Sequence, residues 1–201
     1  MSVARQIKGI ISQLPLGSVF CANDFADLGT LGNIDVIFHR LSSQGSIRKI
    51  GYGLYDRPRK SPILGDLKPN IDQIISAYAR KMGQLFVLDP LNAANVLGIT
   101  TQVPSKLVYL TDGKTHHINV CGIDIYFIHK SPKAIAGASK PIGIILQALR
   151  YIGSTRDDKT LQKIAARLTI QDLNDLQEIK NKTFRNIGPQ IDRIQEIATL
   201  H

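Results

Sequence analysis

The stretch that decides the fold is NIDVIFHRLSSQGSIRKIGYGLYDRPRK, residues 33–60. Its first part predicts a helix that is capped by Asn33 and stacks apolar side chains on one face. Gly45 stands where a helix C-terminal glycine belongs. Two strand-like runs, 46–50 and 54–56, then flank a Gly-Tyr-Gly turn and predict a hairpin. A helix followed by a basic hairpin is the layout of a winged helix-turn-helix.

The residues before this stretch complete a small domain. Apolar side chains at helical spacing predict a helix over residues 2–13, which Pro15 ends. A short second helix follows and is closed by Gly29. We therefore expect a winged helix-turn-helix domain over residues 1–56.

The polar side of the helix that follows Gly29 is the predicted DNA-reading surface, because this fold places such a helix in the major groove. The alternative is a winged helix that serves as a scaffold for protein contacts. If the helix binds DNA, Arg40 is the best candidate for a bidentate contact with guanine. The predicted contacts are Asn33, Val36, His39, Arg40 and Ser43 on the helix, Arg48, Lys49 and Tyr52 at the wing, and Arg57, Arg59 and Lys60 beyond it.

The positive charge of the chain favours a polyanionic partner. The net charge is +9 over 201 residues, of which 43% are hydrophobic. Residues 39–60 hold six Lys or Arg against one acid, whereas residues 156–201 hold eight against seven. The basic excess therefore partly follows the predicted wing.

Other compositional features exclude several classes of protein. Cys21 and Cys121 lie far apart and form no metal-binding pair. The N-terminus lacks an apolar stretch that a signal peptide needs, and no window approaches the roughly 18 apolar residues of a membrane span. We expect a soluble cytoplasmic protein.

The rest of the chain predicts a linker and a second domain. Residues 57–69 contain three prolines and several basic residues, so we expect a linker there, followed by an α+β domain over residues 70–201. A small antiparallel sheet is expected within it, from strands at 106–111, 116–120 and 123–129. The expected helices lie at 70–82, 90–97, 141–152, 157–168, 171–181 and 184–199.

The segment Asp112-Gly113-Lys114-Thr115 imitates the end of a phosphate-binding P-loop. The upstream glycine of that motif would fall at Val108, and the segment joins two predicted strands, so we expect a hairpin turn.

No catalytic constellation emerges from the acidic and histidine residues. His116 and His117 are neighbours on a strand and point to opposite faces, while His129 lies on another strand. Asp112 and Asp124 lack further acids at metal-binding spacing. We therefore expect no metal, no cofactor and no enzymatic activity. A nucleic-acid enzyme that uses these aspartates and histidines is the least favoured alternative.

The chain resembles the AbiEi-like antitoxins of type IV abortive-infection toxin–antitoxin systems. The resemblance rests on GSVFCANDFADLG (17–29), HRLSSQGSIRKIGYGLYDRP (39–58) and AANVLGITTQVPSKLVYLTDGK (93–114). It implies a winged helix-turn-helix repressor that binds its own promoter. Because repressors usually bind inverted repeats, we expect such sites and a monomer or dimer. It also implies a role in phage defence, in which the antitoxin opposes a nucleotidyltransferase-type toxin. The positions that match the family's motif are Arg40, Arg48, Lys49, Gly53 and Tyr55, the last two structural.

The chain departs from the family at Tyr52, which occupies a wing position where the family commonly has a basic residue. Two alternatives to the antitoxin hypothesis stay open. The chain could be a plain winged-helix regulator without a toxin. It could also be an interaction protein that grips a partner through residues 70–201.

Overall fold

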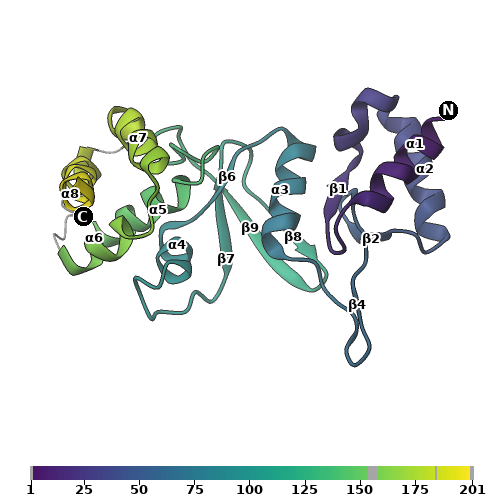
Figure 1. Ribbon diagram of the computed structural model, residues 1–201, viewed down its shortest axis with the longest axis horizontal. Coiled ribbons are helices and arrows are strands. Elements are labelled where there is room, and N and C mark those ends of the chain that lie inside the picture. Colours follow the sequence, from purple (N-terminus) through teal and green to yellow (C-terminus); the bar gives the residue numbers. More distant parts are fainter. Residues whose placement is uncertain (1, 154–157, 184, 200–201) are drawn as a thin grey trace. The chain divides into compact units, whose positions relative to one another are not determined.

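The computed structural model describes residues 2–153, 158–183 and 185–199, which form two compact units (Figure 1). The first unit comprises Met1–Gln84 and Asn119–Ile123, and the second comprises the remainder. The main division of the chain therefore falls after Gln84, later than the linker expected at 57–69.

The first unit has the winged helix-turn-helix fold that the sequence predicts. Its antiparallel sheet has the order β1-β3-β2, and the register pairs Asp56 of β3 with both Val19 of β1 and Arg48 of β2. The second helix of the motif is a 3₁₀ helix, η1. The elements in chain order are α1 (Val3–Gln13), β1 (Val19–Cys21), η1 (Ala22–Leu28), α2 (Leu31–Ser43), β2 (Arg48–Gly51) and β3 (Leu54–Asp56).

Helix α2 is capped at both ends. The Thr30 hydroxyl accepts a hydrogen bond from the backbone N–H of Asn33 at 3.4 Å, so Thr30 is the N-cap and the prediction of Asn33 in that role was wrong. At the other end the Ser46 N–H donates to the Leu41 carbonyl at 3.0 Å, around Gly45 at φ +70°. This is the Schellman arrangement that the glycine predicts.

The buried face of α2 packs into an aromatic core. The ring of Phe38 stands edge-on to those of Phe20, Phe25 and Tyr55, with centroids 5.0–5.4 Å apart. Ile34 of the same helix is fully buried. This core fixes which side of α2 faces solvent.

The first unit continues beyond the winged helix. The predicted linker forms a small hairpin of β4 (Lys60–Ser61) and β5 (Gly65–Asp66), and α3 (Ile71–Met82) follows. Arg80 of α3 pairs with Asp24 of η1, with Nε 2.5 Å from Oδ1, and the Asn23 side chain donates to two carbonyls at the end of α3. These contacts explain why α3 belongs to the first unit, whereas the sequence placed it in the second domain.

The second unit contains most of a mixed sheet of order β6-β7-β9-β8, whose segment Asn119–Ile123 belongs to the first unit. Strand β7 pairs with β6 in antiparallel fashion on one edge and with β9 in parallel on the other. Strand β8 therefore does not pair with β7. Asp112–Thr115 is therefore not the hairpin turn that we expected. Cys121 and Gly122, both at positive φ, join the neighbours β8 and β9 as predicted. The strands are β6 (Phe86–Leu88), β7 (Leu107–Thr111), β8 (His116–Val120) and β9 (Ile123–His129).

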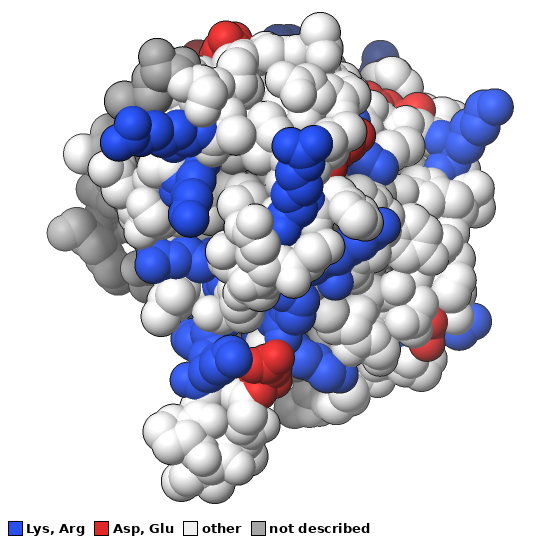
Figure 2. Space-filling view, turned by 90° about the vertical axis from the view of Figure 1, so that its right-hand side faces the viewer, with Lys and Arg blue, Asp and Glu red and all other residues white. Residues whose placement is uncertain are grey.

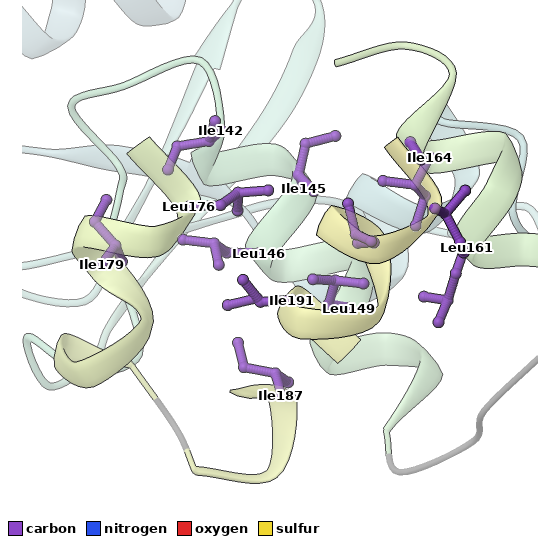
Figure 3. Close-up of a cluster of buried hydrophobic side chains, with 13 residues drawn as sticks. Ile142, Ile145, Leu146, Leu149, Leu161, Ile164, Leu176, Ile179, Ile187 and Ile191 are labelled. Carbon is purple, nitrogen blue, oxygen red and sulfur yellow. The ribbon is translucent and has the colours of Figure 1, made fainter. Parts of the chain in front are cut away.

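The second unit also contains several helices, and the α+β class is confirmed. An aliphatic cluster between them includes Leu146, Leu176, Ile187 and Ile191, all fully buried (Figure 3). Residues 157 and 184, where two helices were expected to begin, lie outside the described residues. The helices are α4 (Pro90–Val96), α5 (Gly143–Ile152), α6 (Asp158–Ala165), α7 (Ile170–Ile179) and α8 (Gly188–Thr199), with short 3₁₀ helices η2 (Lys180–Lys182) and η3 (Arg185–Ile187).

None of the helices in the described ranges is long and apolar enough to cross a membrane.

Candidate nucleic-acid interface

The solvent side of α2 carries the residues that the sequence singled out. We call it the reading face and define it as Asn33, Val36, His39, Arg40 and Ser43, all exposed. Half of the Val36 side chain is accessible, although the residue is apolar. The Ser43 hydroxyl donates to the His39 carbonyl at 3.0 Å, which holds it against the helix. An apolar side chain beside the nitrogen-bearing side chains of Asn33, His39 and Arg40 is suited to base edges, where a thymine methyl lies beside donors and acceptors.

A groove beside the reading face adds basic residues that the sequence analysis missed. It lies between α1 and α2, has a volume of about 260 Å³ and is lined by Arg5 and Lys8 of α1 together with Arg40 of α2. Arg5 and Lys8 stand three residues apart and therefore share one side of α1. The spacing of Arg5 and Lys8 could be read from the sequence. Only the packing of α1 on η1 and α2 shows that these two side chains adjoin the reading face.

Arg48 has an internal role. Its Nη2 and Nε donate to the Asp56 carboxylate at 2.6 and 3.0 Å, and Nη2 also donates to the Leu67 carbonyl at 2.8 Å. Asp56 is completely buried and Arg48 is about one quarter exposed. The hydrogen bonds to Asp56 raise the pKa of Arg48 above its ordinary value. Arg48, predicted as a DNA contact, thus joins β2, β3 and the segment after β5.

Arg57 is also held within the unit. Its guanidinium donates to the Leu14 carbonyl after α1, and its backbone pairs with Gly17 and Ser18. In contrast Lys49, Arg59 and Lys60 are exposed, as a contact to phosphate requires. The five basic residues predicted at and beyond the wing therefore divide into two arginines held by internal hydrogen bonds and three accessible cations.

The wing tip is shaped by three residues at positive φ, Gly51 at +110°, Tyr52 at +53° and Gly53 at +68°. Tyr52 is about half exposed, and its hydroxyl accepts a hydrogen bond from the Asn119 N–H at 3.4 Å. A Cβ placed on Gly53 would lie 2.9 Å from Cε of Lys81. Lys81 of α3 thus brings a basic side chain to the wing tip, beside Tyr52. The sequence analysis missed Lys81 because it is distant from the wing along the chain.

The acidic and histidine candidates for catalysis have separate local partners. His117 contacts Asp124 at 2.9 Å, whereas Asp112 accepts a hydrogen bond from the Leu85 N–H at 2.9 Å. His129 lies 2.9 Å from the Gly113 carbonyl through Nδ1. Within the described ranges, no three His, Cys, Asp or Glu side chains come together as a metal site. The structure does not gather these residues into one centre.

The fold and its exposed helix face define the first unit as a winged helix-turn-helix domain. The chain itself belongs to a family of unknown function, DUF6088, which matches residues 6–176 and so spans parts of both units. No curated protein matches the chain.

Proposed function

We propose that this protein is a winged-helix transcriptional regulator that binds double-stranded DNA and is not an enzyme. The observation that carries the proposal is the reading face of α2, a doubly capped helix whose buried side is fixed by an aromatic core. Helices in this position of the fold enter the major groove with the exposed side toward base edges. In this role the protein works in the cytoplasm, where the promoter is accessible.

Accessible cations around the reading face supply the contacts to phosphate. Lys49 on β2 and Arg59 and Lys60 beyond β3 are exposed, and Arg40 borders the groove that also contains Arg5 and Lys8. If Arg40 reads a base while Lys49, Arg59, Lys60 and one cation of the groove neutralise four phosphates, the logarithm of affinity should fall against that of salt with a slope of about −3.6.

The proposal is tested with the full chain and a duplex from its own upstream region. Gel-shift titrations should show tighter binding to this duplex than to random DNA. Arg40→Ala should cost about 1–3 kcal/mol and relax sequence preference, because a bidentate base contact is lost. Lys49→Ala is the matched control, which should weaken binding to all sequences alike and reduce the salt slope by about 1. Equal affinity of the wild type for native and random DNA would overturn the regulator proposal.

We extend the proposal to autorepression as an antitoxin of the AbiEi-like kind, which rests on the sequence resemblance. The test is coexpression with a nucleotidyltransferase encoded beside the gene. Rescue of growth by the wild type and by Arg40→Ala would show an antitoxin activity that does not need DNA reading. Failure of both to rescue growth would leave a plain regulator. Co-elution of the two proteins would favour the alternative in which the second unit grips a partner.

A further inference from the structure

The hairpin of β4 and β5 ends in an exposed apolar tip. Ile63 is 92% exposed and Leu64 75%, although both are large aliphatic residues. The turn is nevertheless organised, because the Ser61 hydroxyl accepts hydrogen bonds from the N–H groups of Ile63 at 3.3 Å and Leu64 at 3.2 Å. Pro62, also exposed, adds a rigid backbone position. The chain thus holds an aliphatic tip in water with defined local geometry.

The base of this hairpin is fastened to the winged helix. The Leu67 N–H donates to the Arg59 carbonyl at 2.9 Å, which extends the pairing of the hairpin. The Leu67 carbonyl accepts from Arg48, whose other hydrogen bonds reach Asp56 in β3. On the other side, the hairpin follows directly from Arg57, which is bound to the loop after α1. The direction of the hairpin is therefore set by the body of the first unit.

Basic side chains surround the base of the hairpin. Arg59 and Lys68 line a hollow of about 250 Å³ beside it, and Lys60 stands on β4, against one acid, Asp66. Figure 2 shows Lys and Arg side chains gathered at the foot of the uncharged lobe that projects at the bottom of the view. An apolar point with cations behind it is complementary to a DNA groove, whose floor is base edges and whose walls are phosphates.

We propose that the β4–β5 hairpin is a wedge that inserts Ile63 and Leu64 into the minor groove of the DNA bound by α2. Aliphatic side chains in such wedges partly unstack a base step and bend the duplex. Arg59, Lys60 and Lys68 then contact the phosphates on the two edges of the groove. The inference rests on the proposed DNA binding and adds to it a second point of contact and a change in DNA shape. A protein partner for the tip is the alternative that the test must separate.

The test measures affinity and bending with the full chain on circularly permuted fragments that contain the native upstream duplex. The variant is the double substitution Ile63→Ser and Leu64→Ser, which leaves the described contacts of Arg48 and Arg57 in place. Val103→Ser is the matched control, because Val103 is an aliphatic residue of the second unit that is 80% exposed. Thermal unfolding followed by circular dichroism shows that each variant is folded.

We expect the wild type and Val103→Ser to bend the duplex by roughly 20–90°. The tip variant should keep the preference for native over random DNA, bind about 10-fold more weakly and lose most of the bend. A wild type that binds with preference but without a bend overturns the wedge and leaves the regulator proposal standing. The same holds if the tip variant bends DNA as the wild type does. If the wild type shows no preference for native DNA, the bend is measured on random duplex, so that the wedge is judged separately from the regulator proposal. Absence of all DNA binding overturns both the regulator proposal and the wedge.

Discussion

Replacing Arg48 by alanine should destabilise the first unit strongly. Asp56 is completely buried, and the structure gives its carboxylate two hydrogen bonds from this guanidinium. Removing one partner of a buried ion pair leaves an uncompensated charge and costs about 3–5 kcal/mol. The variant also loses the hydrogen bond to the Leu67 carbonyl. In a unit of this size, 1 kcal/mol shifts Tm by roughly 4–8 °C, so we expect Tm to fall by about 12 °C or more.

Thermal and urea unfolding of three variants isolates this effect. Lys49→Ala is the neighbouring control, since Lys49 is exposed and should change stability by no more than about 0.5 kcal/mol. The double variant Arg48→Met with Asp56→Leu should recover most of the loss, because neither charge is then left buried alone. If Arg48→Ala unfolds like the wild type yet binds DNA as weakly as Lys49→Ala, the internal role fails and Arg48 is a DNA contact after all.

Three further changes probe separate features. Gly53→Ala, at φ +68° and facing Lys81, should lower the free energy of unfolding by about 1–2 kcal/mol in urea denaturation, and an unchanged value would refute strain at the wing tip. Asp35→Asn removes an exposed negative charge from α2 and should tighten DNA binding a few-fold, more at low salt, whereas no change would place Asp35 away from the DNA. Lys140 donates to Asp175 and lowers the pKa of that carboxyl, so the stability it contributes is present above pH about 4 and lost as pH falls through the folded pKa. Lys140→Met should raise the pKa of Asp175 in an NMR titration and start acid unfolding at higher pH, and an unmoved pKa would contradict the pairing.

Local patterns predicted the elements of the winged helix well. The spacing of Ile34 and Phe38 determines which side of α2 is buried, and Gly45 marks its end, because both signals act within a few residues. The start of the helix was less readable. Thr30 and Asn33 are both good capping residues, and Gly32 disfavours a helix at the intervening position, so propensity favoured the later start. In the structure the helix nevertheless begins at Leu31, with the Thr30 hydroxyl as its cap, although Leu31, Gly32 and Asn33 are all exposed.

Features that depend on distant residues escaped the sequence analysis. The charge of Arg48 indicated a DNA contact, but the structure pairs its side chain with Asp56 across the β2–β3 pairing and with the carbonyl of Leu67, a residue outside the predicted hairpin. The prolines of residues 57–69 favoured a linker, although the segment closes into a hairpin that Arg48 holds at Leu67. The parallel pairing of β7 and β9 and the docking of α3 on η1 likewise join segments whose local sequence does not show their partner.

The contacts of Arg48 connect the stability of the winged helix to the geometry of the proposed wedge. The same side chain holds Asp56 in β3 and the carbonyl of Leu67 beyond β5, so it links the wing strands to the base of the β4–β5 hairpin. Loss of this side chain should therefore reduce both the stability of the unit and the bend in DNA. Loss of Ile63 and Leu64 at the tip should reduce the bend and the affinity for DNA but leave the stability of the unit unchanged, because the tip contributes little to packing within the unit. The two variants thus separate a residue that positions the hairpin from the residues that would enter the groove.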